Sequence, residues 1–596
     1  MESTRVRFDD LSPGSPGPFG LTGGVEAFTA RRPEEVVPVL AAAEAAAKAG
    51  YWVAGFVSYE AAPGLNPSLS VRPAGLRDPM RDIPLARFEA FTTRVELSDI
   101  DSVDYPPGAY NVSGWSPDSS RRDYRDSLAV TGRAIMSGEI KRGKHTFRLH
   151  AAFNGDQLAL YRDLLQSQRG PHAACISGNR FGLVSVSPER FFKISGGVLS
   201  VRPVLASVRR GRWLEEDSEY AVSIAADRDL NYANQVLLAE AEAELVQLGE
   251  PLPRDQSPII SLDRLELMWH LTARVGVRLR KDVGLTRIFE ALFPPLAVTG
   301  VPKEEAMAVI ATTEDTPRGV YCGTIGFLAP EGTGGTEASF SVAVRTVVVD
   351  NEEGVAEYGV GTAITSVPDV ASGYEEARLK ARVLVDRRPA FQLVERFRQD
   401  DGDVAGLDRK LDILEDSARY FGYMLRRDDA VAELEKAAAS GGSEEIELRV
   451  SRDGSLETVT QPVGAWSGSL EGAPSLIGQV AAERVSLDNI FLFHKTTDSR
   501  LRDVIRRQHP NVDTVILVNE QGNVAGSLDG CVLVELDDGW VTPPRRCGNA
   551  VSALCRELVL SGELAEREFT VTDLEKAARI VVIDDVVGWR LVTLEI

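Results

Sequence analysis

Hydrophobic and polar positions in the N-terminal part of the chain predict long strands mixed with helices. Apolar or alternating runs typical of strands cover Tyr51–Tyr59, Ala338–Val349 and Val355–Ile364. Helical periodicity marks Arg32–Ala49 and Tyr220–Leu248. The two kinds of element follow one another without a strict βαβ rhythm, so we expect an α+β fold.

A shift in composition at Arg387–Pro389 predicts a domain boundary. We therefore expect a first domain over 1–388 and a second over 389–596. The second domain contains a helical pattern at Leu411–Tyr423 and a strand pattern at Cys531–Leu536. It is expected to be α+β as well.

Charge and cysteine content narrow the classes of function. The 596-residue chain has a net charge of -22, which argues against nucleic acid or an anionic membrane as a partner. Its five cysteines form no Cys-x-x-Cys pair, which favours a reducing compartment over a disulfide framework. No stretch reads as a signal peptide or a membrane span, so we expect a cytoplasmic protein.

Six short stretches carry a more specific signal because they occur together and in a fixed order. They are Gly55–Pro63, Ser187–Phe191, Phe293–Lys303, Thr316–Gly326, Val342–Thr346 and Tyr374–Ala381. In this order they resemble the chorismate-utilising family, which includes anthranilate, aminodeoxychorismate and isochorismate synthases. The resemblance covers about Ala54–Leu384 and favours the aminodeoxychorismate synthase branch, which leads to para-aminobenzoate.

The resemblance implies a site for chorismate, a ring that carries two carboxylates. Such a ligand calls for cationic side chains and backbone amide donors. Glu189 corresponds to the family's general acid, and His270 corresponds to a histidine near the reacting ring. The resemblance assigns substrate binding to Arg345, Lys380, Gly359, Gly361, Tyr321 and Thr299.

Several positions depart from the family pattern. Leu205 stands where aminodeoxychorismate synthases often have a lysine nucleophile, and Ala206 replaces a glycine. Leu230 replaces a glutamate that helps to hold magnesium, and Asp229 would replace it only with a slip of one residue, about 100° of turn on a helix. Glu376, the other expected magnesium ligand, is kept. Magnesium therefore remains possible but doubtful as a cofactor.

A further departure lies at Arg142, which aligns with a family glutamine or, in isochorismate synthases, with a lysine base. Arginine stays protonated and does not act as a base, although it binds anions.

The C-terminal part resembles a class IV, pyridoxal-phosphate-dependent aminodeoxychorismate lyase. The stretches that carry this resemblance are Ala418–Gly422, Leu492–Thr497, Leu517–Glu520 and Trp540–Pro544. Lys495 falls on the Schiff-base lysine, and so is assigned catalysis and cofactor binding. Gly526 stands where the family has the glutamate that pairs with the pyridinium, and Gly548–Cys555 lacks the family's phosphate-loop residues. Pyridoxal phosphate is therefore a doubtful cofactor.

Three readings of function remain open. The first is an aminodeoxychorismate synthase that uses ammonia, either free or from a separate glutamine amidotransferase subunit, since the chain has no Gly-x-Cys-x-Gly elbow. The second is a repurposed enzyme that acts on chorismate or a related anion without the usual magnesium and pyridoxal phosphate chemistry. The third is a non-catalytic chorismate-binding protein. A homodimer is compatible with each of them.

Overall fold

The computed structural model describes residues 5–11, 17–76, 78–98, 108–226, 228–330, 336–364, 370–385, 390–439, 441–537, 539–550 and 552–595. The side chains of 228–233, 336, 370–372 and 383 also lie outside the description. The predicted boundary at Arg387–Pro389 and the side chains of Asp229 and Leu230 therefore fall outside the described residues. Within the described ranges, no helix is long and apolar enough to cross a membrane.

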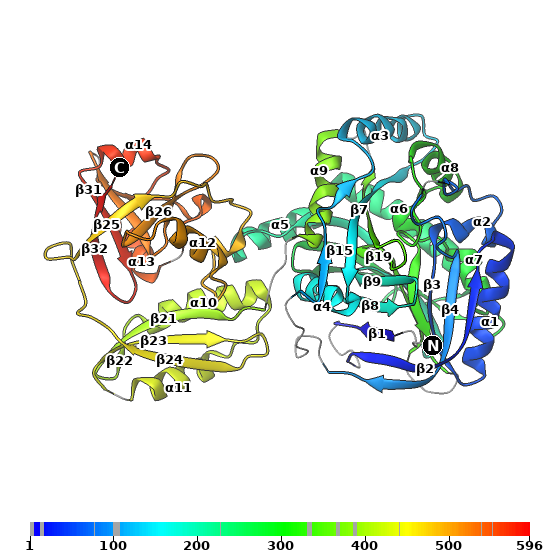
Figure 1. The fold of residues 1–596 in the computed structure, drawn as a ribbon, viewed down its shortest axis with the longest axis horizontal. Coiled ribbons are helices and arrows are strands. Elements are labelled where there is room, and N and C mark those ends of the chain that lie inside the picture. The colour runs from blue at the N-terminus through cyan, green and yellow to red at the C-terminus, as the bar shows by residue number, and fades with distance from the viewer. Residues whose placement is uncertain are drawn as a thin grey trace. The chain divides into compact units, whose positions relative to one another are not determined.

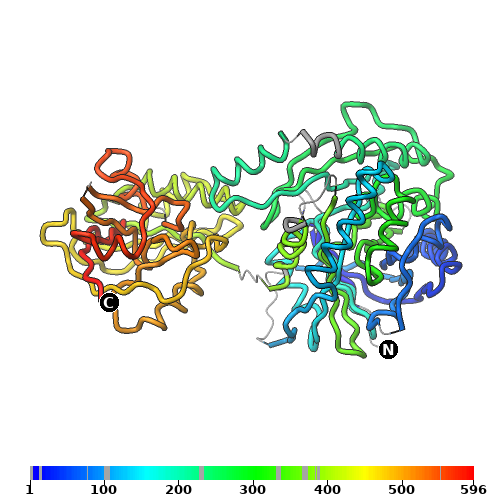
Figure 2. Tube along the Cα trace, turned by 90° about the horizontal axis from the view of Figure 1, so that it is seen from above, coloured from blue at the N-terminus to red at the C-terminus, as the bar shows by residue number. Residues whose placement is uncertain are grey.

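The chain forms two compact units (Figures 1 and 2). The N-terminal unit comprises Met1–Arg210 and Ala221–Pro389, and the C-terminal unit comprises Gly211–Tyr220 and Ala390–Ile596. The sequence did not predict that 211–220 would belong to the C-terminal unit. The Tyr420 hydroxyl donates to the Gly211 carbonyl at 2.7 Å, and the Trp213 ring lies 5.5 Å from that of Phe493. These contacts fix the segment to the C-terminal unit.

One half of the N-terminal unit is an antiparallel sheet that carries much of the candidate site. Its strands, in order of pairing, are β7 (Arg142–Gly155), β20 (Val355–Ile364), β19 (Thr346–Asp350), β9 (Phe181–Ser187) and β8 (His172–Ser177). The helices that pack on it are α3 (Arg121–Met136), α4 (Gln157–Gln168) and α9 (Val370–Ala381).

The other half is a second run of antiparallel strands. In order of pairing they are β4 (Ala86–Glu96), β3 (Trp52–Val57), β17 (Thr324–Leu328), β18 (Thr336–Val342), β10 (Arg190–Ser195), β11 (Val198–Arg202) and β15 (Met268–Leu279). β1 (Arg5–Asp9) pairs with β8 on one side and with β2 (Phe19–Ala30) on the other, and β2 pairs with β4. The two runs are thus continuous through β1 and β2.

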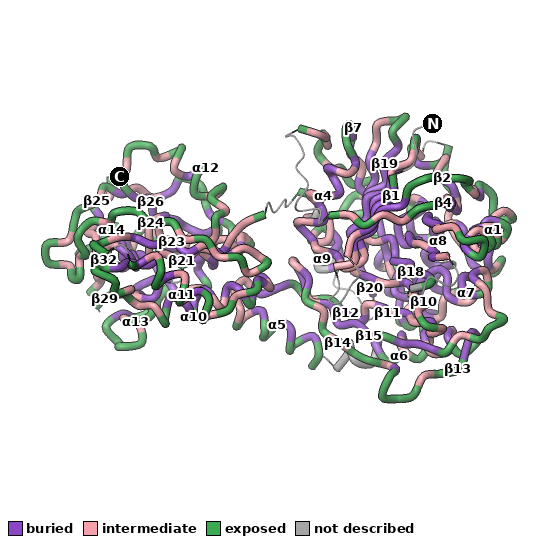
Figure 3. The backbone as a smooth tube through the Cα atoms, turned by 90° about the horizontal axis from the view of Figure 1, so that it is seen from below, coloured by how far each residue is buried: buried purple, intermediate pink, exposed green. Residues whose placement is uncertain are grey.

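Apolar side chains fill the space between these strands and the helices that cover them. The rings of Phe192, Phe289 and Phe340 are fully buried, with centroids 4.9 to 5.6 Å apart. α1 (Val36–Lys48) buries one face and leaves the other exposed, as its periodicity requires. Figure 3 shows the same division between buried strands and outward helix surfaces.

One predicted strand is interrupted in the structure. The run Ala338–Val349 forms two strands, β18 and β19, because the backbone turns at Arg345, where φ is 52°. Its apolar character continues across the turn, so periodicity did not reveal it. The predicted helix Tyr220–Leu248 is helical on both sides of position 227, which lies outside the described residues, as α5 (Leu214–Ala226) and α6 (Arg228–Val246).

The C-terminal unit contains two further sheets. β21 (Leu393–Asp400), β23 (Ser443–Val450) and β24 (Leu456–Pro462) form one, with α10 (Leu407–Phe421) and α11 (Arg427–Ala438) packed on it. The other includes β26 (Thr514–Val518), β25 (Ser475–Val480), β32 (Gly588–Leu594), β31 (Arg579–Asp584) and β28 (Cys531–Leu536), with α13 (Ala553–Ser561) beside β31. The predicted α+β class is confirmed for both units.

Candidate active site

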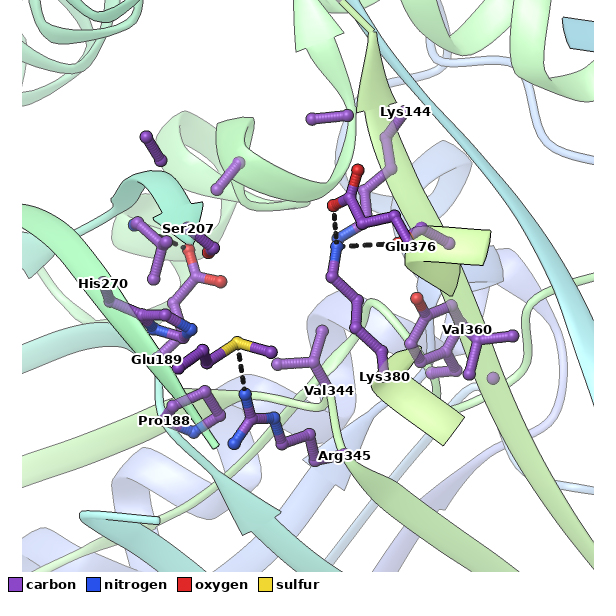
Figure 4. Close-up of a pocket in the computed structure, with 18 of the residues that line it drawn as sticks. Lys144, Pro188, Glu189, Ser207, His270, Val344, Arg345, Val360, Glu376 and Lys380 are labelled. Carbon is purple, nitrogen blue, oxygen red and sulfur yellow. Dashed lines mark hydrogen bonds and ion pairs between the residues drawn. The ribbon is translucent and has the colours of Figure 1, made fainter. Parts of the chain in front are cut away.

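A cavity of about 200 Å³ opens in the N-terminal unit (Figure 4). It lies among β7, β20, β15, α9 and the strand β12 (Val204–Arg209). Among the described lining residues, the cations Arg142, Lys144, Arg345 and Lys380 outnumber the carboxylates of Glu189 and Glu376. A cavity with this charge favours a small anion.

The fold brings together most of the residues that the sequence assigned to a site. Those that line the cavity are Glu189, His270, Arg345, Lys380, Glu376, Gly359, Gly361 and Tyr321. Thr299 does not line it: the Thr299 side chain is buried, and its hydroxyl donates to the Pro295 carbonyl at 3.1 Å. The structure does not bring Thr299 to this cavity, and its assignment to substrate binding stays a prediction.

Glu189 presents a buried carboxyl group to the cavity. It precedes β10, and its Oε1 accepts from the Val204 backbone amide at 3.3 Å. Burial raises the pKa of the Glu189 carboxyl, and Lys144 only partly opposes that rise. A raised pKa lets a carboxyl keep its proton to higher pH, which suits a general acid.

His270 lies on β15, opposite Ser207 of β12, and its side chain is buried beside Glu189 in Figure 4. Burial, together with the positive charges of Arg345, Lys380 and Lys144, holds the pKa of His270 well below its ordinary value. The imidazole is therefore neutral at physiological pH. A neutral imidazole both donates and accepts a hydrogen bond, so it can orient a polar ring substituent without adding charge.

Arg345 is a buried cation whose described partners are both uncharged. Its guanidinium donates to Gln168 Oε1 at 3.0 Å and to the Met268 sulfur at 2.8 Å, and a thioether is a weak acceptor. Burial lowers the pKa of Arg345. A buried guanidinium is costly unless a carboxylate or phosphate meets it. We infer that the ligand supplies that anion.

Lys380 and Glu376 form an ion pair on α9 at the other side of the cavity. The Lys380 ammonium lies 2.7 Å from Glu376 Oε1 and donates to the Gly361 carbonyl at 3.0 Å. Burial alone would raise the pKa of Glu376, but Lys380, Thr362 and Lys144 together outweigh burial and the pKa is lowered. Lys380 therefore places a positive charge beside the carboxylate that the sequence assigned to magnesium.

The magnesium that the family resemblance implies does not fit this arrangement. Magnesium takes an octahedral set of oxygens, whereas Glu376 already accepts from Thr362 and Lys380. The described residues contain no cluster of three metal-binding side chains. No step below passes through a metal ion.

Gly359 and Gly361 line the cavity and are positions where β20 is closely packed. A Cβ atom at Gly359 would lie 2.1 Å from Cγ of Tyr321, and one at Gly361 would lie 2.5 Å from the His145 carbonyl oxygen. Both distances are shorter than atoms allow, so each position requires glycine. The Tyr321 ring can then lie against the β20 backbone.

Sequence reasoning passed over Lys144, whose side chain faces the cavity in Figure 4. Burial lowers the pKa of Lys144. Alternation along a strand places Lys144 on the same face as Arg142, which lines the same cavity. This two-residue spacing was the signal available in the sequence. Leu205 also lines the cavity and brings no nucleophile to it.

Lys495 lies in the C-terminal unit, outside this cavity. Its ammonium is 2.7 Å from Glu395 Oε1 and 3.2 Å from Asp585 Oδ2. Burial alone would lower the pKa of Lys495, but the two carboxylates raise it above its ordinary value. Pyridoxal phosphate needs a lysine that can become a neutral nucleophile. These residues do not fit the cofactor, and no step is assigned to it.

Comparisons with known proteins agree with the two-unit architecture. The family model described as chorismate binding enzyme matches residues 19–386, and the model for amino-transferase class IV matches residues 392–594. An aminodeoxychorismate synthase from Streptomyces griseus is 29% identical over 266 residues, which are 44% of this chain and 36% of that protein. An anthranilate synthase component 1 from Acinetobacter calcoaceticus is 26% identical over 45% of this chain and 54% of its own length.

Among solved structures, anthranilate synthase component I from Streptococcus pneumoniae is similar with a TM-score of 0.51 and 17% identity. The match covers 63% of this chain and 93% of that one, and it supports the fold. The chain spans only 54% and 36% of the lengths of the two curated relatives named above.

Proposed function

Because the chain belongs to the family of chorismate-binding enzymes, we propose that its N-terminal unit binds chorismate and aminates the ring, as an aminodeoxychorismate synthase does. The observation that supports this most directly is Arg345, a buried guanidinium whose described partners are uncharged and which faces the cavity. Chorismate offers two carboxylates, one for Arg345 and one for the cations on the opposite side, Lys144 and Lys380.

Glu189 acts as the general acid in this proposal. The nitrogen of ammonia forms a bond to a ring carbon as the bond from the ring to the hydroxyl oxygen breaks. The Glu189 proton passes to that oxygen, which leaves as water, so Glu189 ends as a carboxylate. Lys144 then stabilises that carboxylate through its positive charge, since the two groups interact across the cavity. Neutral His270 orients the ring.

The proposed nitrogen source is ammonia, either from solution or delivered by a separate glutamine amidotransferase subunit. This part of the proposal rests on the sequence, in which no Gly-x-Cys-x-Gly nucleophile elbow occurs. We propose a cytoplasmic location, where chorismate and a separate glutamine amidotransferase subunit would both be present.

A direct test is to incubate the purified chain with chorismate and ammonium, with magnesium in one arm and EDTA in another, and to follow the products by mass spectrometry. We expect chorismate to be consumed and aminodeoxychorismate to appear. Chorismate that stays intact in both arms would contradict the proposal. Binding without turnover, measured by calorimetry, would instead indicate a non-catalytic chorismate-binding protein.

A second candidate is an enzyme that acts on chorismate or a related anion without magnesium. The Lys380–Glu376 ion pair favours it, because Lys380 already supplies a positive charge beside that carboxylate. Leu205 favours it as well, since a covalent route through a lysine at this position is absent. Turnover in the presence of EDTA to a product other than aminodeoxychorismate supports this candidate, and turnover abolished by EDTA contradicts it.

The raised pKa of Glu189 predicts the pH dependence of the reaction. A general acid must carry its proton, so kcat should be constant below the pKa of Glu189 and fall as pH rises through it. Because free ammonia increases with pH, kcat should be measured at a constant concentration of free ammonia. A profile that stays flat to alkaline pH would show that Glu189 does not donate the proton.

A further inference from the structure

The C-terminal unit contains a second cavity, of about 370 Å³, which Lys495 and Asp585 line. Lys495 pairs there with Asp585 and, behind the cavity lining, with Glu395. The side chains of Glu395 and Asp585 are 1% and 6% exposed. They come from β21 and from the turn between β31 and β32. The ammonium of Lys495 therefore joins two segments that are distant in sequence.

Asp585 also occupies the N-terminus of α13. Its Oδ1 accepts from the Ser552 hydroxyl at 2.7 Å and from the Leu554 amide at 2.9 Å, and its Oδ2 accepts from the Ala553 amide at 3.2 Å. The free amides at a helix N-terminus and the helix dipole favour an anion at this position. The chain fills the position with its own carboxylate.

Lys410 fixes the backbone around this carboxylate. Its ammonium donates to the Asp585 carbonyl at 2.9 Å and to the Arg396 carbonyl at 3.0 Å. Asp585 is thus held through both its side chain and its main chain. Two ammonium groups, those of Lys495 and Lys410, face the two carboxylates, so the charges balance within the protein.

We infer that Lys495, Glu395 and Asp585 form a structural ion-pair cluster, in which Asp585 takes the anion position at the N-terminus of α13. An ammonium nitrogen has no lone pair with which to attack a carbonyl carbon. Lys495 therefore forms no Schiff base, and the C-terminal unit works without a carbonyl cofactor. This inference concerns the C-terminal unit alone and does not depend on the function proposed for the N-terminal unit.

Substituting Asp585 in the full chain tests the cluster. Asp585→Ala leaves Lys495 short of a partner and uncovers the amides of Ala553 and Leu554. We expect hydrogen exchange in the peptide that contains these amides to accelerate, and the Tm of the C-terminal unit to fall by roughly 5–15 °C. Added formate should partly restore both, because it supplies a carboxylate at the vacated position. If Asp585→Ala does not fold, Asp585→Asn takes its place, because it keeps the shape and removes the charge. Its hydrogen exchange and Tm are then compared with those of the unaltered protein.

The matched control is Asp573→Ala. Asp573 accepts from the Thr570 amide at 2.8 Å at the start of a short surface helix, α14 (Val571–Lys576). We expect a shift of only a few degrees from its loss, and no effect of formate. An unchanged Tm and unchanged hydrogen exchange in both Asp585 variants would overturn the inference.

The cofactor part is tested on the unaltered protein. The full chain is mixed with pyridoxal phosphate and reduced with borohydride, and the peptide that carries Lys495 is analysed by mass spectrometry. Lys436, which is 77% exposed, serves as the reference for non-specific labelling. We expect Lys495 to be labelled less than Lys436. A pyridoxyl group on Lys495 in excess of that on Lys436 would overturn the inference.

Discussion

Glu189→Gln is expected to lower kcat for chorismate amination by about 10²–10⁴-fold, the range for loss of a positioned general acid. Glutamine keeps the shape and an oxygen that can accept from the Val204 amide, but it has no proton to give to the leaving hydroxyl. Because the pKa of Glu189 is raised by burial, the neutral amide resembles the protonated carboxyl. We therefore expect KM and Tm to change little.

Steady-state kinetics of the two proteins at a constant concentration of free ammonia measures this effect. The control is Glu305→Gln, on the exposed face of α8 (Lys303–Thr313), which should match the unaltered protein. The falling limb of the pH profile should also disappear in Glu189→Gln, which a purely structural role would not produce. A variant that retains at least half of the original kcat would show that another group donates the proton.

Arg345→Met is expected to raise KM for chorismate by roughly 10–150-fold. That range corresponds to the loss of about 1.5–3 kcal/mol from a hydrogen bond to a charged group. Methionine fills much of the same volume, and it removes a buried cation whose described partners are Gln168 and the Met268 sulfur, neither of them charged. The folded protein should therefore lose little stability, while the ligand loses the group that meets one carboxylate.

The measurement is Kd for chorismate by calorimetry together with KM, so that binding and turnover are separated. Arg287→Met on α7 (Leu285–Leu292) is the control, because Arg287 is 51% exposed and pairs with Glu290 at the surface. An unchanged Kd in Arg345→Met would place the ligand's carboxylates elsewhere in the cavity. A large loss of Tm without a change in Kd would make Arg345 a structural residue.

Two apolar runs in the sequence predicted the bounds of single strands correctly. Val355–Ile364 has the same bounds in the sequence prediction and in β20, and Cys531–Leu536 has the same bounds in β28. The run Ala338–Val349 was less informative. Its apolar character continues through a residue with φ of 52°, and backbone torsion leaves no mark on hydropathy.

The motifs predicted residues that lie close together in the folded chain, but they did not predict the contacts of each residue. Glu189, His270 and Arg345 come from three separate stretches and line one cavity. Thr299 belongs to a matching stretch too, yet its hydroxyl is bound within its own turn. Lys144 belongs to no motif, and the structure places it in the cavity because residues two apart on a strand share a face.

The sequence by itself predicted the α+β class, the family of the N-terminal unit and eight of the residues that line the cavity. These follow from local periodicity and from short motifs, both of which depend on residues that are close together in the sequence. Only the tertiary structure decided which charges are paired. Lys380 pairs with Glu376, the carboxylate assigned to a metal, and Asp585 pairs with Lys495, the lysine assigned to a cofactor. Arg345, in contrast, has no acidic partner among the described residues. Ion pairing depends on distances of a few ångströms between segments far apart in sequence, and on burial that strengthens each charge, and neither is visible until the chain is folded.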